Sequence, residues 1–366
     1  MAGSGFGTNF RITTWGETHG AGVGVVVDGC PAGLPLERED VQKYLDRRKP
    51  GQSKYTTQRK EGDQVEILSG IFEGRTTGTP ISMVVYNKDQ RSKDYSNIKD
   101  IYRPGHADFT FDMKYGFRDY RGGGRSSGRE TIGRVAAGAV AAKVLKELGI
   151  EIKAYAKAIA GIEVSKDHFD LEEMNNNPFN MPDKEAAKLV QEKADQMIKE
   201  MDSIGGIIEC QITGMPVGIG ETVFDKLDAE LSKAIMSIGS VKGFEIGDGF
   251  EAANLRGSEN NDDFICVDGK VAKETNHSGG VLGGMSDGST IVFRAAIKPT
   301  PSIAQTQKTV NRDLDNVEIE IHGRHDPMIV PRAVVVVESM AAVTILDGVL
   351  KNLGATMDNI KKIYGE

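Results

Sequence analysis

Residues 121–148 read RGGGRSSGRETIGRVAAGAVAAKVLKEL, a turn rich in glycine and arginine that leads straight into a helical pattern. Apolar side chains recur at helical spacing over residues 131–148, and a glycine that can end the helix follows. Ahead of the helix, Ser127 and Glu130 match a capping box. Because alanine and glycine occupy several faces of this segment, we expect a buried, tightly packed helix.

The turn belongs to a longer segment, residues 103–134, that is rich in groups suited to anions. It holds six arginines, one histidine and three consecutive glycines. Arginine offers a fixed fork of donors to phosphate or carboxylate, glycine lets a backbone approach a ligand, and a helix N-terminus adds free N–H groups. The net charge of the chain is −8, which argues against general nucleic-acid or anionic-membrane binding. A small anionic ligand fits better.

The remaining helix and strand signals follow one another irregularly, which favours an α+β fold over a regular βαβ alternation. Helices are predicted over residues 36–48, 184–201, 225–238 and about 332–352, and strands over residues 10–15, 22–29, 64–72, 81–87, 206–212, 289–298 and 316–323.

The chain shows no secretory signal, and its longest apolar run, AVVVVESMAAVTIL from Ala333, contains Glu338 and is too short to span a bilayer. The three cysteines are far apart and fit neither a disulfide framework nor zinc spacing. We therefore expect a cytoplasmic protein that binds neither nucleic acid nor membrane.

Three motifs place histidine or aspartate beside glycine and arginine. TTWGETHGAGVG, residues 13–24, presents His19 in a glycine-rich turn, and RPGHAD presents His106 beside Arg103. IHGRHDPMIVPR, residues 321–332, carries an Arg–His–Asp run at a strand end. Histidine is easily tuned to exchange protons near neutral pH. Each motif can also be structural, as a surface turn or a plain salt bridge.

Two other functions fit parts of the sequence. An RNA-binding module could use the RGG-like loop, although aromatic residues there are sparse. A metal-dependent phosphatase could use His322, His325 and Asp326, although no HExxH or related pattern supports them. Neither a Walker A motif nor a GxGxxG fingerprint is present.

Taken together, the motifs resemble those of the chorismate synthase family over nearly the whole chain. In the order of the family they are FRITTWGETHG from residue 10, RPGHAD from 103, DYRGGGRSSGRET from 119, MDSIGG from 201, SIGSVKGFEIGDGF from 237, NHSGGVLGG from 276, KPTPSI from 298 and RHDPMIVPRA from 324. Two departures are Thr18, where serine is common, and Met328, where cysteine is often found.

The resemblance implies a lyase of aromatic amino acid biosynthesis that catalyses the last step of the shikimate pathway. Phosphate is lost from 5-enolpyruvylshikimate 3-phosphate by anti-1,4-elimination to give chorismate, with reduced FMN required and no net redox change. It also implies a single domain over residues 1–366, built as a β-α-β sandwich with helices between two antiparallel sheets, and a homotetramer.

Site roles follow from the resemblance at matching positions. His19 would be the general acid on the departing phosphate, His106 would protonate or stabilise the reduced flavin ring, and Asp326 would help move a proton through the flavin. The substrate-binding residues would be Arg48, Arg103, Ser127, Arg129 and Arg324. The FMN-binding residues would be Arg125, Ser126, Ser127, Gly239, Ser240, Gly283, Lys298, Pro299, Thr300, Pro301, Ser302 and Arg324, and no metal is expected.

Arg48 and Lys54 match positions that the family assigns to NADPH. The chain has no separate reductase domain and no dinucleotide fingerprint, so it resembles the type that receives FMN already reduced by an external flavin reductase. The source of the reduced flavin, and whether NADPH binds directly, stay open at this point.

Overall fold

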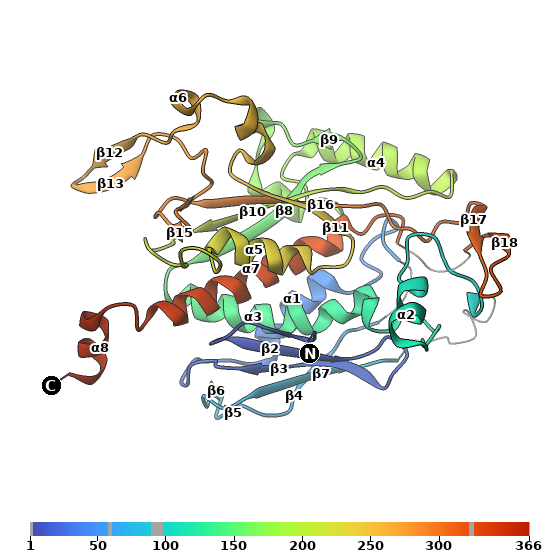
Figure 1. Ribbon diagram of the computed structural model, residues 1–366, viewed down its shortest axis with the longest axis horizontal. Helices are drawn as coiled ribbons and strands as arrows, with labels where there is room; N and C mark the ends of the chain where they lie inside the picture. The colour runs from blue at the N-terminus through green and yellow to red at the C-terminus, as the bar shows by residue number, and fades with distance from the viewer. Residues whose placement is uncertain (1–2, 58–60, 89–97, 322–325, 366) are drawn as a thin grey trace.

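In the computed structural model, which describes residues 3–57, 61–88, 98–321 and 326–365, two five-stranded antiparallel sheets enclose a layer of helices (Figure 1). The lower sheet in Figure 1 has the strand order β1-β2-β3-β7-β4 and the upper sheet the order β11-β16-β10-β8-β9. The predicted β-α-β sandwich of an α+β protein is therefore confirmed.

The lower sheet comes from the first quarter of the chain. Its strands are β1 (Gly5–Phe6), β2 (Arg11–Gly16), β3 (Gly22–Asp28), β4 (Val65–Ile67) and β7 (Ile81–Tyr86). Burial alternates along β2, where Ile12 and Thr14 face the helices and Arg11, Thr13 and Trp15 are exposed. One face of this sheet thus packs on the core and the other meets solvent, as is common for antiparallel sheets. A small hairpin, β5 (Ile71–Phe72) and β6 (Arg75–Thr76), lies beside it.

The upper sheet comes from the middle and later parts of the chain. Its strands are β8 (Glu151–Ile159), β9 (Ile162–Glu163), β10 (Gly206–Thr213), β11 (Val241–Ile246) and β16 (Ile291–Ile297). Ile291, Phe293, Ala295 and Ile297 of β16 are buried and alternate with more exposed residues. Outside this sheet lie α4 (Lys184–Lys199) and the short α6 (Gly257–Asn260) (Figure 1).

The helical layer contains α1 (Arg38–Arg48), α3 (Thr131–Glu147), α5 (Leu227–Met236) and α7 (Val330–Asn352). Contact between α3 and α7 is the most extensive helix–helix packing in the described chain. Gly138 makes it possible, because a Cβ at that position would lie 2.2 Å from Ser339 Cβ. The expected tight packing of the 131–148 helix is confirmed.

Helix α7 is longer than the apolar run in the sequence. Its 23 residues are long and apolar enough to cross a membrane by length and composition alone. In the fold, however, α7 runs between the two sheets, and 78% of its most apolar 18-residue window is buried (Figure 1). Its apolarity is that of a core helix.

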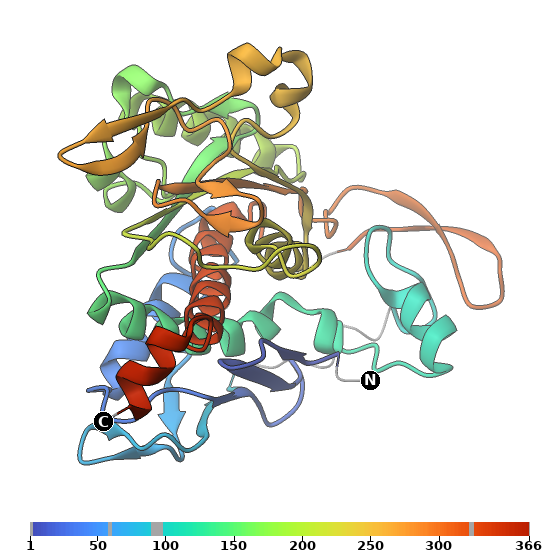
Figure 2. The same cartoon turned by 60° about the vertical axis from the view of Figure 1, so that its left-hand side comes forward.

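Several elements project from the sandwich. The hairpin of β12 (Phe264–Val267) and β13 (Lys270–Lys273) extends from one end (Figure 2), and α8 (Met357–Tyr364) leaves the body at the C-terminus (Figure 1). The hairpin of β17 (Gln307–Val310) and β18 (Asn316–Ile319) lies beside α2 (Asp108–Tyr115). The β14 (Val281–Leu282) and β15 (Met285–Ser286) hairpin packs near the start of α5.

Candidate active site

A cleft of about 600 Å³ opens at the end of the helical layer where α3 and α7 begin. Loops following β16 and α5, the arginine-rich loop and the end of α1 complete its wall. Helix N-termini carry partial positive charge and unpaired N–H groups, so two such ends favour an anion. Of the described residues that line the cleft, eight are Lys or Arg and three are Asp or Glu.

The arginine-rich loop forms one wall through backbone conformations that suit glycine. Gly122, Gly123 and Gly124 all have positive φ, at 70°, 79° and 52°. The loop then makes two short 3₁₀ turns, Gly124–Ser126 and Gly128–Glu130, before α3 begins. This chain of turns places Gly122, Gly123 and Gly128 in the cleft wall.

The predicted capping box forms only in half. Ser127 Oγ accepts a hydrogen bond from Arg129 N at 3.3 Å. Glu130 points elsewhere, accepting from Thr14 Oγ1 at 3.0 Å and from Arg134 Nε at 2.9 Å. The sequence pattern missed this because it does not include β2, which lies against the loop.

The other residues of the loop that were assigned to a cofactor lie at the cleft wall. Arg125 donates to the carbonyl oxygens of Thr14 and Gly16, both at 3.1 Å, which fixes its side chain against β2. Ser126 Oγ donates to Gly123 O at 2.7 Å. Ser126 and Ser127 both line the cleft.

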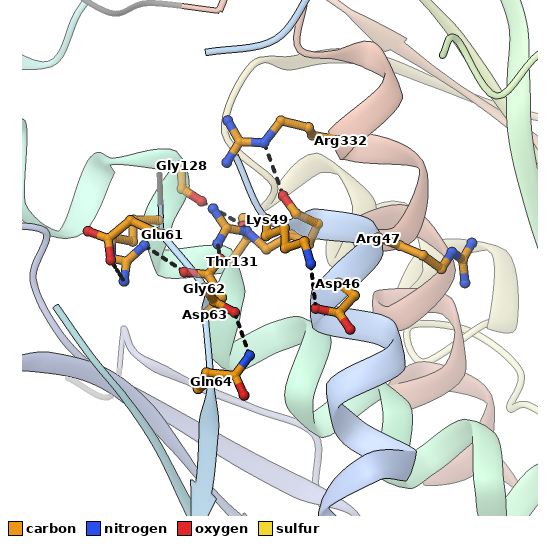
Figure 3. A network of polar contacts seen from close by, with 12 residues as sticks. Asp46, Arg47, Lys49, Glu61, Gly62, Asp63, Gln64, Gly128, Thr131 and Arg332 are labelled. Atoms are coloured by element: carbon orange, nitrogen blue, oxygen red, sulfur yellow. Dashed lines mark hydrogen bonds and ion pairs between the residues drawn. The ribbon is translucent and has the colours of Figure 1, made fainter. Parts of the chain in front are cut away.

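At the floor of the cleft, one carboxylate holds two of the expected substrate arginines. Asp63 accepts from Arg48 Nη1 at 2.7 Å through one oxygen and from Arg129 Nη1 at 2.9 Å through the other. Arg48 Nε also donates to Thr131 Oγ1 at 3.1 Å (Figure 3). Burial lowers the pKa of Arg48 to about 9, opposed by the charge of Asp63, so its guanidinium stays protonated at neutral pH.

A second carboxylate, Asp326, joins the same floor. It accepts from Thr57 N at 2.8 Å and from Arg332 Nη1 at 2.7 Å. Arg332 Nε in turn donates to the carbonyl oxygen of Arg48 at 3.0 Å (Figure 3). The expected proton-transfer residue is thus held at the cleft by the first turn of α7.

His106 lies where the loop after residue 102 meets the loop after β16. Its Nδ1 contacts Pro104 O at 3.0 Å and its Nε2 contacts Ser302 Oγ at 2.8 Å. Since a carbonyl can only accept, Nδ1 carries the proton and Nε2 accepts from the serine. Burial, together with the charge of Arg103, lowers the pKa of His106 to about 4, so the imidazole is neutral at pH 7.

The two loops approach closely at Gly105. A Cβ there would lie 2.6 Å from Pro301 Cβ, and Lys298 Nζ donates to Gly105 O at 3.0 Å. Thr300, Pro301, Ser302 and Lys298 therefore line the cleft together with His106. Gly239 and Ser240, from the loop between α5 and β11, complete this wall.

Arg103 also lines the cleft, but its donors face inward. Its Nε and Nη2 donate to the two oxygens of Asp108 at 2.7 and 2.8 Å. Burial would raise the pKa of Asp108, yet the hydrogen bonds from Arg103 outweigh it and hold that pKa below its usual range. The structure places Arg103 at the site with its charge already paired.

His19 packs behind the glycine loop. A Cβ on Gly122 would lie 2.5 Å from Cδ2 and 2.7 Å from Nε2 of the His19 ring. Thr18, its neighbour, lines the cleft directly. The ring thus lies next to the cleft, in space that stays free because residue 122 has no side chain.

Not every expected residue reaches this cleft. Lys54 is exposed and pairs with Asp195 at 2.8 Å, and Gly283 lies in the exposed turn between β14 and β15. Pro299 is exposed in the loop after β16 and is not among the described lining residues. Arg324, His322 and His325 lie outside the described residues.

Three buried polar atoms on the cleft wall have no hydrogen-bond partner within the described chain. They are Thr18 Oγ1, Thr300 Oγ1 and Arg129 Nη2, which forms an ion pair with Glu61 Oε2 at 3.7 Å, beyond hydrogen-bond distance. Buried polar atoms are normally satisfied. Their grouping around one cleft indicates a polar ligand that supplies the missing contacts.

Sequence reasoning assigned no role to four residues at or behind the cleft wall. Arg134, Lys242 and Arg332 line the cleft and lie inside motifs quoted above, whereas Asp63 lies behind Arg48 in a segment without a motif. Arg332 was predicted only as the start of a helix. Its place at the end of IHGRHDPMIVPR was the one available signal.

The sequence and fold match those of known proteins. A family model described as chorismate synthase matches residues 10–350. The chorismate synthase of Lachnospira eligens is 67% identical over 364 residues, covering 100% of both chains. That of Methanococcoides burtonii is 57% identical over 355 residues, covering 96% of this chain and 97% of its own. A crystal structure of a chorismate synthase, 31% identical, matches with a TM-score of 0.77 over 98% of this chain and 96% of that chain.

Proposed function

Because this chain belongs to the chorismate synthase family, we propose that its reaction takes place in the cleft at the start of α3 and α7. The chain converts 5-enolpyruvylshikimate 3-phosphate to chorismate and phosphate, as a lyase of the shikimate pathway. This activity decides against the RNA-binding module and the metal-dependent phosphatase. The choice of this cleft rests on its cationic wall, in which three buried polar atoms have no hydrogen-bond partner among the described residues.

The substrate bears a phosphate and two carboxylates. We propose that Arg48 and Arg129 bind it from the floor, with Arg103, Ser127 and Arg324 as further contacts. The described members of this set line the cleft, beside the N-terminus of α3. Electrostatic groups fixed in advance around a developing charge usually give the largest single contribution to catalysis.

The same cleft fits reduced FMN. The volume of about 600 Å³ lies within the range of pockets for cofactors of this size. Arg125, Ser126, Gly239, Ser240 and the residues from Lys298 to Ser302 would hold it, with Thr300 Oγ1 lacking any other partner among the described residues. When bound, reduced FMN supplies electron density as the C–O bond breaks.

The proton-handling residues surround this space. His19 would hold a proton toward the departing phosphate oxygen. Asp326, fixed by Thr57 and Arg332, would accept a proton on the opposite floor of the cleft. Neutral His106 gains basicity when an anion comes near its ring, because a negative charge favours the imidazolium. Its Nε2 would then donate rather than accept.

Further properties follow from the same proposal. We propose a cytoplasmic homotetramer whose residues 1–366 form a single domain, and the main hydrophobic cluster from Phe10 to Leu346 supports the single domain. Lys54 lies away from the cleft that Arg48 lines, which favours an external flavin reductase over direct NADPH binding. Gly283 would contact FMN only from outside this cleft.

The test measures phosphate release from 5-enolpyruvylshikimate 3-phosphate under anaerobic conditions, with and without reduced FMN. We expect release only with reduced FMN, and His106→Ala and His19→Ala should retain the fold while losing most activity. For Asp326→Asn, flavin binding should persist with slower chemistry. Turnover by both histidine variants at the wild-type rate would place the reaction elsewhere.

A further inference from the structure

We propose that Asp63 is a positioning residue that sets the separation and orientation of Arg48 and Arg129 before any anion binds. This inference rests on the proposed function, because it gives Asp63 a purpose only if the cleft holds the substrate. Asp63 has no motif of its own and comes from the segment that precedes β4.

The geometry of Asp63 is that of a clamp. Its side chain has 0% exposed area, and its two oxygens each accept one guanidinium donor, at 2.7 and 2.9 Å. Burying a carboxylate so completely is costly unless each oxygen is paired. Its carbonyl accepts from Gln42 Nε2 at 3.2 Å, so α1 anchors the backbone as well.

The backbone at Asp63 is also unusual. Its φ is 41°, in the left-handed region that few residues other than glycine, asparagine and aspartate adopt readily. Residues in sparsely populated backbone regions cluster at functional sites. Together with the buried carboxylate, this places one specific acid between two arginines that arrive from α1 and from the start of α3.

The surrounding charges alternate in a chain. Glu61 pairs with Arg129, Arg129 with Asp63, and Asp63 with Arg48. Arg332 then donates to the carbonyl oxygen of Arg48 and to the carboxylate of Asp326. Three carboxylates therefore balance three guanidiniums in the described floor of the cleft.

This balance has a chemical consequence. The carboxylates reduce the mutual repulsion of the guanidiniums, so Arg48 and Arg129 can both line the cleft. The charge of Asp63 thus weakens the attraction of the cleft for anions in general, while its hydrogen bonds fix the geometry of the two arginines for one anion. Loss of its charge should strengthen the binding of a small, adaptable anion and weaken the binding of a large substrate that needs a fixed clamp.

Asp63→Asn is the direct test, because asparagine keeps the shape and tolerates the left-handed backbone. We expect the KM for 5-enolpyruvylshikimate 3-phosphate to rise about 10-fold, as befits the loss of one charge-assisted hydrogen bond. The inhibition constant of inorganic phosphate should instead fall, because the floor gains a net positive charge. A purely structural defect would weaken both.

Two variants separate charge from position. Asp63→Glu restores the charge on a longer side chain, so we expect a phosphate inhibition constant like that of the wild type and a raised KM. Glu230→Gln removes a carboxylate that pairs with Lys233 at 3.2 Å on α5 and does not line the cleft, so both constants should stay unchanged.

The outcomes distinguish this inference from the proposed function. A wild-type KM in Asp63→Asn, or a parallel weakening of substrate and phosphate, would overturn the positioning role. If Arg129→Gln in addition kept the wild-type KM, the cleft itself would be the wrong site. An impaired Arg129→Gln beside a normal Asp63→Asn would reject the role of Asp63 alone.

Discussion

Gly122→Ala should disable the site through His19 while leaving the fold intact. The φ of Gly122 is 70°, and its Cβ would lie 2.5 Å from Cδ2 of the His19 ring. Ordinary contacts of a Cβ begin near 3.4 Å. The imidazole must therefore retreat by about 1 Å, and a misplacement of that size can cost about 10²-fold in rate.

Backbone strain alone would not cause this loss. An alanine in the left-handed region costs about 1–2 kcal/mol wherever it occurs in the loop. Gly124→Ala is the matched control, because its φ is 52° and a Cβ there meets nothing within 4 Å. Both variants should lose similar stability in thermal unfolding, and only Gly122→Ala should lose activity.

The assay is anaerobic phosphate release with reduced FMN, run as single turnovers so that binding and chemistry separate. For Gly122→Ala we expect kcat to fall about 10²-fold with a smaller change in KM. If the two variants turn over alike, the position of His19 behind Gly122 does not matter for the reaction, and its role as general acid is refuted.

Three further predictions concern stability. The lowered pKa of His106 keeps it neutral in the fold while the unfolded chain takes up a proton near pH 6.5, so stability is lost as the pH falls from 6.5 toward 4. His106→Asn should reduce the loss of unfolding free energy between pH 7 and 4.5 by roughly 2 kcal/mol. Urea unfolding at each pH measures this, and the same pH profile of stability in the variant and the wild type would contradict it. Gly138→Ala should destabilise the fold by more than about 3 kcal/mol, because its Cβ would meet Ser339 where two helices cross; a melting temperature like that of the wild type would show that the crossing can relax. Glu338→Gln should cost about 2 kcal/mol, because its NH2 group replaces one of the two oxygens that accept from Arg47 and cannot accept in its place. The kcat should stay unchanged, and a loss of activity without a loss of stability would contradict this.

The sequence predicted those parts of the fold whose hydrophobic pattern is strong. The helix over residues 131–148 ends within one residue of α3, and the helix expected from about residue 332 begins at Val330. The nine-residue strand β8, read EIKAYAKAI, was missed because its alanines have low strand propensity and its lysines hide the alternation. Pairing with β10 decides its conformation, and that partner is about 50 residues away.

Candidate site residues could be predicted where a motif indicates their chemistry. They could not be predicted where the arrangement depends on contacts between distant segments. His106 was predictable from RPGHAD, but its contact with Ser302, 196 residues later, depends on the fold. Asp63 illustrates the limit most clearly. An aspartate before a strand usually faces solvent, and only the fold brings Arg48 and Arg129 to its two oxygens.

The location of positive charge explains how an acidic chain can act on a trianionic substrate. The net charge is −8, so the field of the whole molecule does not attract anions from a distance. The described wall of the cleft nevertheless carries eight Lys and Arg side chains against three carboxylates. Screening at physiological salt extends over about 8 Å, so this local excess acts mainly on a ligand that has already entered. If Arg48 and Arg129 bind the substrate as proposed, recognition depends on their buried, directed donors, and a carboxylate that fixes the direction of these donors matters more than one that changes the total charge.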